Sequence, residues 1–241
     1  KIFRDCSAFE CKQSFRRFMV CDREMMSPGL AALLANPDAG LQGEGTRLLK
    51  AGNTCTVWAT QVDGRALVVK RYNIKGFGHA LYRAFRRTRA AVSWKNAQRL
   101  ALQGIPTARP VALLEERLGP LRGRAWFVAE YVAGDTVLHL CEQQQAETGV
   151  TGKAVVTLLE QLARGRISHG DMKASNIILS DRGPVIVDLD AMKSHVNALF
   201  YRGRQRRDLD RFILNWKDCR SVREMFQELI EDSALLAPHL S

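Results

Sequence analysis

Apolar and polar positions change their spacing along the chain, and this change divides it into regions. Residues 47–132 contain short apolar runs separated by turn residues, which is typical of strands. After Gly134 the apolar positions recur at helical spacing. The pattern therefore predicts an α+β chain with a strand-rich first half and a mainly helical second half.

Five strands and one helix are expected in the first half. Asp63-Gly64 is a hairpin signal between the second and third strands, and Gly104-Ile105-Pro106 ends the helix. Residues 1–46, with turn signals at Ser27-Pro28-Gly29, are expected to be a helical or partly irregular extension. The expected strands are 48–54, 55–60, 66–72, 111–114 and 125–132, and the expected helix is 79–103.

The second half is expected to hold four helices and one short hairpin. The hairpin joins the apolar triplets Ile177–Leu179 and Val185–Val187 through a turn at Asp181-Arg182-Gly183-Pro184. The expected helices are 135–147, 152–164, 205–217 and 221–236.

The segment from His169 to Asn176 carries the clearest chemical signal. Asp171 and Asn176 are five residues apart, a spacing with which kinases supply a proton acceptor and a magnesium ligand. Lys173 would place a positive charge near a transferring phosphate. Asp188 follows the second apolar triplet and would complete an oxygen site suited to Mg²⁺. We therefore assign Asp171 and Lys173 to catalysis, and Asn176 and Asp188 to the metal.

Three earlier segments fit ATP binding once this loop is present. Lys70 ends an apolar strand and corresponds to the lysine that holds ATP phosphates. The turn at Gly52, Asn53 and Thr54 precedes it at a suitable distance to cover those phosphates with backbone N–H groups. Glu130 and Val132, at the end of the fifth strand, would offer a carbonyl and an amide to adenine.

Net charge and its placement suggest an anionic partner. The chain carries +11, and no acidic residue occurs between Gly64 and Leu114, where eleven basic residues lie. Such a block attracts polyanions, including anionic membrane surfaces and nucleic acid. Within the expected helix the candidate docking residues are Arg83, Arg86, Arg87 and Arg89.

The sequence shows neither a signal peptide nor an apolar run long enough to cross a membrane. Its six cysteines suit free thiols in a reducing cytosol.

These motifs together resemble the protein-kinase-like superfamily, and within it the bacterial lipopolysaccharide core kinases, which phosphorylate Kdo or heptose. The resemblance runs from about Leu48 to Trp216. It is carried by Val69–Asn73, Trp94–Leu100, Gly104–Thr107, His169–Lys173 and Arg207–Phe212.

The resemblance implies a two-lobed kinase fold, with a five-stranded antiparallel sheet and one helix in the first lobe. Residues 1–46 would then be an extension, 47–132 the N-lobe and 133–241 the C-lobe. It also implies ATP and Mg²⁺ as cofactors, and transfer of the γ-phosphate to a sugar hydroxyl of a lipid-linked anionic glycan. The protein would be cytoplasmic and peripheral on the inner membrane, and nucleic acid is not the expected partner.

The sequence departs from protein kinases in three places. Gly170 replaces the arginine of His-Arg-Asp, and Asp188-Leu189-Asp190 replaces Asp-Phe-Gly. Asp190 either adds to the metal site or caps a helix, with the cap slightly favoured. The expected helix 79–103 has no glutamate to pair with Lys70, so Ser93, Asn96, Gln98 or Glu44 would have to substitute. A kinase for proteins or soluble small molecules, and a pseudokinase that binds an anionic partner, remain as alternatives.

Overall fold

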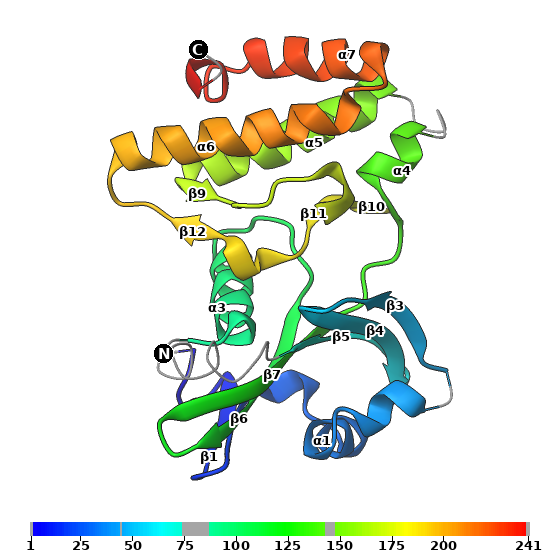
Figure 1. Ribbon diagram of the computed structural model, residues 1–241, viewed down its shortest axis with the longest axis vertical. Helices are drawn as coiled ribbons and strands as arrows, with labels where there is room; N and C mark the ends of the chain where they lie inside the picture. The colour runs from blue at the N-terminus through cyan, green and yellow to red at the C-terminus, as the bar shows by residue number, and fades with distance from the viewer. Residues whose placement is uncertain (1, 44, 74–86, 143–147, 240–241) are drawn as a thin grey trace. The chain divides into compact units, whose positions relative to one another are not determined.

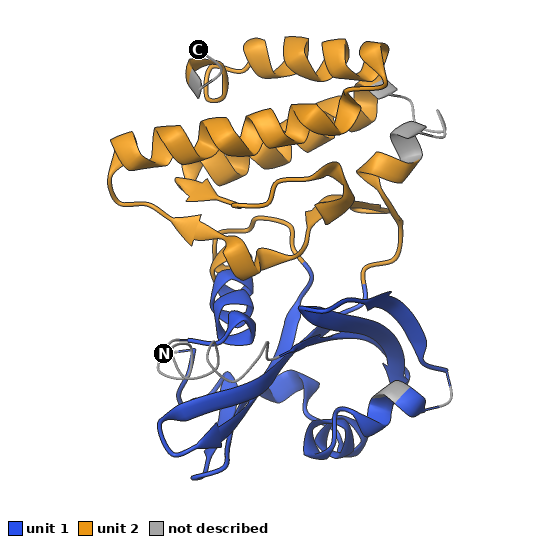
Figure 2. Cartoon of the chain, in the orientation of Figure 1, with its two compact units in different colours: residues 1–98, 108–131 blue, residues 99–107, 132–241 orange. Residues whose placement is uncertain are grey.

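The computed structural model describes residues 2–43, 45–73, 87–142 and 148–239 (Figure 1). The chain forms two compact units (Figure 2). The first contains residues 1–98 and 108–131, and the second contains residues 99–107 and 132–241. An α+β architecture is confirmed, with an antiparallel sheet in the first unit and most of the helices in the second.

The sheet of the first unit has seven strands in the order β1-β2-β6-β7-β5-β4-β3, all paired antiparallel. The five expected strands are present as β3 to β7, but two further strands were missed. The strands are β1 (Phe9–Gln13), β2 (Arg17–Asp22), β3 (Arg47–Ala51), β4 (Cys55–Val62), β5 (Arg65–Tyr72), β6 (Pro110–Leu118) and β7 (Leu121–Glu130).

The missed strands lie in residues 1–46, which were expected to be helical or irregular. Strand β2 is buried on both faces: Met19 and Cys21 belong to one hydrophobic cluster, and Phe18 and Val20 to another. A strand buried on both faces has no alternation of apolar and polar residues, so periodicity alone does not distinguish it from a buried helical segment.

In the described part of the chain, one helix packs on each face of the sheet (Figure 1). Helix α1 (Pro28–Ala35) packs Leu30, Leu33 and Leu34 into the cluster around Trp58. Helix α3 (Arg89–Leu102) packs Ala90, Ala91 and Trp94 into the cluster around Tyr72. Two short 3₁₀ helices precede β3, namely η1 (Arg23–Met25) and η2 (Ala39–Gln42).

The turn between β4 and β5 has the conformation that its sequence predicts. Asp63 and Gly64 have φ of 47° and 77°, which suits a two-residue hairpin turn. The Asp63 carboxylate also accepts a hydrogen bond of 2.8 Å from the Gly29 amide in the first turn of α1. Hydrogen bonds from Ser27 and Gly29 lower the pKa of Asp63. One aspartate thus serves both the hairpin and the helix.

Helix α3 is shorter than the helix expected over 79–103. It begins at Arg89, and residues 74–86 lie outside the described residues. Gly104 ends the helix as expected, with φ of 68° and a hydrogen bond from the Ile105 amide to the Leu100 carbonyl.

The second unit has the four expected helices, with different ends. Asn197 caps α6 by accepting a hydrogen bond of 2.8 Å from the Leu199 amide, so this helix starts seven residues before the expected position. The helices are α4 (Val137–Glu142), α5 (Thr148–Arg164), α6 (Ala198–Ile213) and α7 (Arg220–Glu231).

The expected hairpin is also confirmed, and short strands and 3₁₀ helices complete the unit. Strands β10 and β11 pair in register from Ile177 opposite Ile186 to Ser180 opposite Gly183. The remaining elements are β8 (Asp135–Thr136), β9 (Ile167–Ser168), β10 (Ile177–Ser180), β11 (Gly183–Ile186), β12 (Lys193–Ser194), η3 (Ala174–Asn176), η4 (Leu189–Ala191), η5 (Leu214–Trp216) and η6 (Ala237–His239).

Two expectations from the sequence concern membrane-spanning helices and the state of the cysteines. Within them, no helix combines the length and the apolar character needed to cross a bilayer. Five of the six cysteines are free thiols there: Cys6, Cys11, Cys21, Cys55 and Cys219.

Candidate active site

The loop after β9 alternates buried and accessible side chains. Met172 and Ala174 are 2% and 0% exposed, so they anchor the loop in the second unit. Asp171 and Lys173 lie between these anchors and keep side chains that are 33% and 41% exposed. The alternation therefore presents the two expected catalytic residues to the same accessible side of the loop.

A buried carboxylate on α6 holds the start of this loop. Asp208 accepts hydrogen bonds from the backbone amides of His169 at 2.6 Å and Gly170 at 2.9 Å. Burial raises the pKa of Asp208, while the two amide donors oppose that rise. The His169 ring contacts the Val187 carbonyl at 3.1 Å through Nε2, and a carbonyl only accepts, so Nε2 carries the proton.

The backbone position of Gly170 explains why no larger residue stands there. Its φ is 81°, and a Cβ at this position would lie 2.8 Å from the Ala191 carbonyl oxygen. A side chain would therefore meet both an unfavourable backbone conformation and a backbone atom that cannot move away cheaply. The Gly of His-Gly-Asp is required by the packing of the loop against η4.

The Asp171 carboxylate lies between two cations. Lys173 Nζ is 3.3 Å from Asp171 Oδ2, and Arg211 Nη2 is 2.7 Å from Asp171 Oδ1. Arg211 comes from α6, three residues after Asp208, so one face of this helix contacts the loop twice. These contacts fix the direction of the carboxylate that would accept a proton.

A backbone hydrogen bond joins Asn176 to Val187, the residue before Asp188. The Val187 amide donates to the Asn176 carbonyl at 2.9 Å, and Asn176 Nδ2 donates to the Asp171 carbonyl at 2.9 Å. Because the amide nitrogen is engaged, the amide oxygen is the atom left to contact a cation. Asp188 has φ of 64°, an unusual value for a residue other than glycine and one that recurs at functional sites.

The donor set of this region suits a hard cation. Amide and carboxylate oxygens are the ligands that Mg²⁺ prefers, and Mg²⁺ commonly takes one or two protein ligands and completes its shell with water and phosphate. Across the residues that the structure describes, no three His, Cys, Asp or Glu side chains gather into a ready-made metal site. Asn176 and Asp188 therefore fit a magnesium ion that arrives with phosphate.

Lys70 lies on the α3 face of the sheet in the first unit. Its Nζ is 5.0 Å from the centroid of the Tyr72 ring, and the Tyr72 hydroxyl is 2.8 Å from the Ser93 hydroxyl. Ser93, one of the candidates to replace the missing glutamate, is thus engaged with Tyr72. Glu44 lies outside the described residues.

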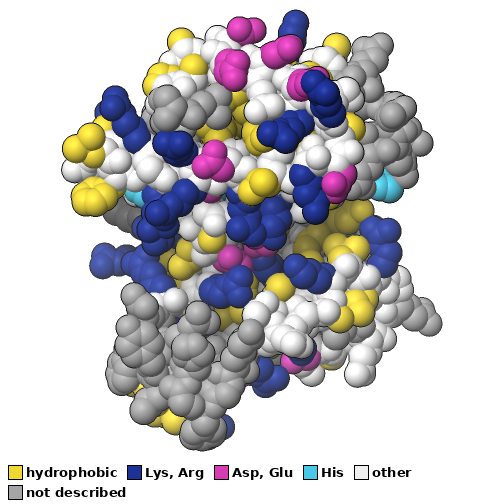
Figure 3. All heavy atoms as spheres, turned by 45° about the horizontal axis from the view of Figure 1, so that its top comes forward, with side chains coloured by type: hydrophobic (Ala, Val, Ile, Leu, Met, Phe, Trp, Pro, Cys, Tyr) yellow, Lys and Arg dark blue, Asp and Glu magenta, His cyan; other side chains and the backbone are white. Residues whose placement is uncertain are grey.

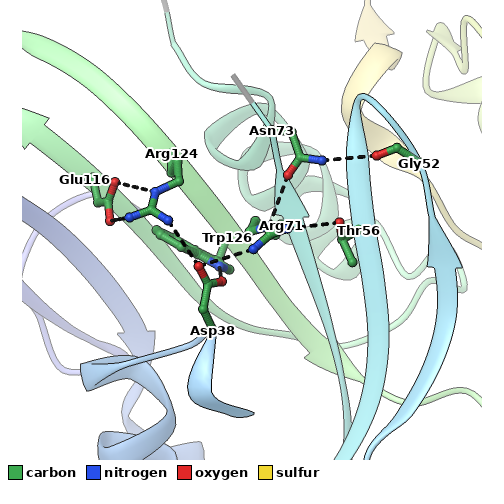
Figure 4. A network of polar contacts seen from close by, with 8 residues as sticks. All are labelled: Asp38, Gly52, Thr56, Arg71, Asn73, Glu116, Arg124 and Trp126. Carbon is green, nitrogen blue, oxygen red and sulfur yellow. Dashed lines mark hydrogen bonds and ion pairs between the residues drawn. The ribbon is translucent and has the colours of Figure 1, made fainter. Parts of the chain in front are cut away.

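The turn at residues 52–54 is held by Asn73, which directly follows strand β5 (Figure 4). Asn73 Nδ2 donates to the Gly52 carbonyl at 3.1 Å, and the Asn73 amide donates to the Thr54 carbonyl at 3.0 Å. Arg71 Nε in turn donates to Asn73 Oδ1 at 3.1 Å. This network fixes the shape of the turn that was expected to cover phosphates.

The same network reaches the segment after α1. Arg71 Nη1 is 3.3 Å from the Asp38 carboxylate, which also accepts a hydrogen bond of 3.1 Å from Trp126 Nε1 (Figure 4). Residues that precede β3 therefore brace the expected ATP-binding turn, which the sequence had not indicated.

The segment that was expected to contact adenine is an ordered strand end. The Glu130 amide donates to the Arg109 carbonyl, and the Tyr131 amide donates to the Ala66 carbonyl, both at 2.9 Å. Neither bond involves the Val132 amide, so the contact of that amide with adenine stays a prediction.

A model of the Lipopolysaccharide kinase (Kdo/WaaP) family matches residues 42–231. The chain belongs to this family. It is therefore a lipopolysaccharide core kinase, a phosphotransferase that uses ATP and acts on a sugar hydroxyl. Family membership favours this activity over that of a protein kinase or a soluble small-molecule kinase, and ATP turnover with Mg²⁺ distinguishes an enzyme from a pseudokinase.

A comparison of this structure with solved structures finds 1501 matching chains. One of them, described as "WaaP in complex with acyl carrier protein", has a TM-score of 0.58 and 21% sequence identity; the match covers 89% of this chain and 95% of that chain. No curated protein sequence matches the chain. At this identity the structural likeness confirms the two-lobed kinase fold, and the family match carries the function.

The structure describes only half of the four arginines assigned to docking in this lipopolysaccharide kinase. Arg83 and Arg86 lie outside the described residues. The Arg87 guanidinium lies 5.1 Å from the centroid of the Phe3 ring, and that of Arg89 lies 5.1 Å from the centroid of the Tyr72 ring. On the face drawn in Figure 3, Lys and Arg side chains are spread over both units.

Two residues of the site were not singled out from the sequence. Asp208 and Arg211 stand three apart in the stretch Arg207–Phe212, which had served only to identify the family. A spacing of three on a helix places two side chains on one face, and this was the available signal. Nothing in the sequence showed that the face would contact the loop at residues 169–171.

Proposed function

We propose that the loop at residues 169–176 performs the phosphotransfer of this lipopolysaccharide kinase, with Asp171 as the proton acceptor for the attacking sugar hydroxyl. The observation that carries this assignment is the fixed direction of the Asp171 carboxylate between Lys173 and Arg211, on a loop that Asp208 clamps. Lys173 would balance negative charge on the transferring phosphoryl group.

ATP would supply the phosphoryl group, and Mg²⁺ would neutralise charge on its phosphate oxygens. We propose Asn176 and Asp188 as the magnesium ligands, since their oxygens are of the right kind and their segments are joined by a backbone hydrogen bond. In the first unit, Lys70 and the backbone of Gly52, Asn53 and Thr54 would hold the phosphates. The Glu130 carbonyl and the Val132 amide would contact adenine.

The acceptor would be a Kdo or heptose hydroxyl of a lipid-linked core glycan at the cytoplasmic face of the inner membrane. The basic, acid-free stretch from Gly64 to Leu114 supports an anionic glycan and an anionic membrane surface as partners. We also propose that residues 47–132 and 133–241 act as the two kinase lobes, with residues 1–46 as an extension of the first.

A panel of deacylated core oligosaccharides tests the acceptor. ATP-dependent phosphate transfer would be measured, and mass spectrometry would locate the phosphate on the product. We expect transfer to a Kdo or heptose residue. Transfer to none of the oligosaccharides, with turnover on free monosaccharides or protein hydroxyls, would contradict the proposed acceptor.

Sedimentation with liposomes tests the docking surface. Replacement of Arg83, Arg86, Arg87 and Arg89 by glutamine should weaken binding to anionic liposomes, because each basic group near an anionic leaflet contributes about 1 kcal/mol. Neutral liposomes and duplex DNA provide the comparisons. Binding that does not respond to salt or to the four substitutions would exclude the electrostatic account, and a preference for DNA would favour nucleic acid.

Acyl carrier protein is a second candidate partner, because the solved WaaP structure contains it. We propose that this chain also binds such a carrier protein. Co-purification of the two proteins after co-expression would test this, and elution as separate species at micromolar concentration would oppose it.

A further inference from the structure

A small pocket in the first unit lies on the side of the sheet where α3 packs, apart from the residues expected to bind ATP. It has a volume of about 190 Å³ and is lined by, among others, Phe3, Phe18, Arg87, Glu115, Arg117 and Arg122. A water molecule takes up roughly 30 Å³ in the liquid, so the pocket has room for several waters or for a tetrahedral oxyanion.

A β-bulge turns one arginine toward this pocket. Glu115 pairs with Ala125, whereas Arg117 pairs with Arg122, so β7 has one residue more than β6 between the two pairs. The extra residue reverses the direction of the side chains that precede it. Arg124 consequently contacts Glu116 and Asp38 in the network of Figure 4, while Arg122 lines the pocket with Arg117.

Glu115, the one carboxylate among the described residues that line the pocket, already has hydrogen-bond donors. Glu115 is 1% exposed and accepts hydrogen bonds from Arg117 Nε at 3.0 Å and Nη2 at 2.6 Å, and from the Thr88 hydroxyl. Arg122 Nε is 4.0 Å from the same Glu115 oxygen that Arg117 contacts. Among the described lining residues, three guanidinium groups and one carboxylate carry charge, so their net charge is positive.

One nitrogen of the Arg122 guanidinium has no hydrogen-bond acceptor among the described residues. Its Nη1 is buried, and no hydrogen-bond acceptor reaches it there. A buried donor without a partner is costly, and the cost is larger for a charged group. The contact of Arg122 with Glu115 uses Nε and leaves this Nη1 without an acceptor.

Aromatic rings hold two of the guanidinium groups in place. Arg117 lies 4.2 Å from the centroid of the Phe18 ring, and Arg87 lies 5.1 Å from that of Phe3. A ring on one face of a guanidinium leaves its edge, where the N–H groups are, free to bind an anion.

We propose that this pocket binds a phosphate group through Arg87 and Arg122, while Arg117 remains paired with Glu115. Guanidinium groups bind phosphate with paired N–H donors, and a small turn of the Arg122 side chain would bring its buried Nη1 to the pocket and give it an acceptor. The phosphate is either free in solution or part of an anionic lipid headgroup.

Calorimetry with inorganic phosphate tests the proposal. A saturating non-hydrolysable ATP analogue with Mg²⁺ would be present to occupy the catalytic site. The variants are Arg87→Gln and Arg122→Gln, and the matched control is Arg16→Gln, which removes the same charge from an exposed position of the same unit outside the pocket.

We expect the wild type and Arg16→Gln to bind phosphate alike, and each pocket variant to bind about tenfold more weakly or worse, as the loss of a charged hydrogen bond implies. No phosphate binding by the wild type at millimolar concentration would overturn the proposal. Equal affinity in the wild type and all three variants would overturn it as well.

Flotation with phosphatidylglycerol and phosphatidylcholine vesicles distinguishes the two sources of phosphate. Arg122→Gln is the decisive variant, because Arg122 lies outside the set of arginines assigned to membrane docking. Weaker binding to phosphatidylglycerol vesicles, together with weaker phosphate binding, would identify a lipid headgroup. Unchanged vesicle binding with weaker phosphate binding would identify a soluble phosphate.

Discussion

Asp208 accepts a hydrogen bond of 2.6 Å from the backbone amide of His169, and this contact ties helix α6 to the proposed catalytic loop. The other carboxylate oxygen accepts from the Gly170 amide. The bond matters because Asp171 follows immediately, so any movement of the two amides displaces the proposed proton acceptor. A displacement of about 1 Å in an active site can cost about 10²-fold in rate.

Asp208→Asn should therefore lower both stability and turnover. Asparagine keeps the shape but has one acceptor oxygen, and its NH₂ group would face an amide donor. We expect a loss of about 1–3 kcal/mol in the free energy of unfolding, as for a buried donor left without a partner. Chemical denaturation measures the first effect, and steady-state kinetics measures the fall in kcat.

Asp210→Asn is the matched control, since Asp210 lies two residues further along α6 with an exposed side chain. It should leave both quantities nearly unchanged. Equal effects of the two substitutions would mean that charge on α6, and not the bond to the loop, is responsible.

Gly170→Ala should destabilise the protein more than Gly183→Ala. Both glycines have positive φ, 81° and 104°, and alanine in such a conformation costs roughly 1–3 kcal/mol. Only at Gly170 would the new Cβ also meet a backbone oxygen, that of Ala191; nothing lies within 4 Å at Gly183. Urea denaturation of both variants measures the difference, and equal losses would show that the loop relaxes away from η4.

Asp171→Ala should lower kcat by about 10²–10⁴-fold, the usual contribution of a general base. ATP binding should be nearly intact, because the proposed phosphate contacts come from other residues. Rapid-quench kinetics and calorimetry measure the two effects separately. Near-normal turnover would remove Asp171 from the mechanism.

The candidate catalytic loop could be proposed from the sequence because its signal is local. Asp171, Asn176 and Asp188 are recognised by spacing along the chain, and the hairpin between the last two follows from its apolar triplets and turn. The contacts of Asp208 and Arg211 with this loop join segments about forty residues apart. Their sequence spacing shows that they share a helix face but not what that face contacts.

Two structural features were hidden for different physical reasons. Strand β2 has apolar residues on both faces, so it lacks the alternation by which a half-buried strand is recognised. The direction of Arg122 depends on a bulge at Gly123 and Arg124, and a shift of one residue changes which side chains face which side of the sheet. Regular alternation would have placed Arg122 and Arg124 on the same face.

Asp188→Asn should weaken magnesium-dependent ATP binding. Asparagine tolerates the left-handed backbone conformation of this position, so the substitution removes charge with little strain. Asn176→Ala should also weaken binding by removing an oxygen ligand. Calorimetry with ATP, with and without Mg²⁺, provides the measurement.

Asp181→Asn is the control for the metal site, since Asp181 is exposed in the turn between β10 and β11. Unchanged affinity for Mg²⁺-ATP in both Asp188→Asn and Asn176→Ala would exclude the proposed ligands. Asp190→Asn decides the role of Asp190: weaker Mg²⁺-ATP binding assigns it to the metal, and unchanged binding assigns it to the 3₁₀ helix η4.

Asn73→Ala should weaken ATP binding without unfolding the first unit. The substitution removes the hydrogen bond to the Gly52 carbonyl and the acceptor for Arg71 Nε, so the turn at residues 52–54 loses its side-chain support. The backbone bond from residue 73 to Thr54 remains, which limits the damage. The loss of one or two neutral or singly charged hydrogen bonds predicts a rise in KM for ATP of about 3- to 10-fold, with a smaller change in kcat. Asn36→Ala, in an exposed position after α1, is the control. If KM for ATP stays at the wild-type value in Asn73→Ala, the turn does not cover the phosphates, and its bracing by Arg71 and Asp38 serves stability alone.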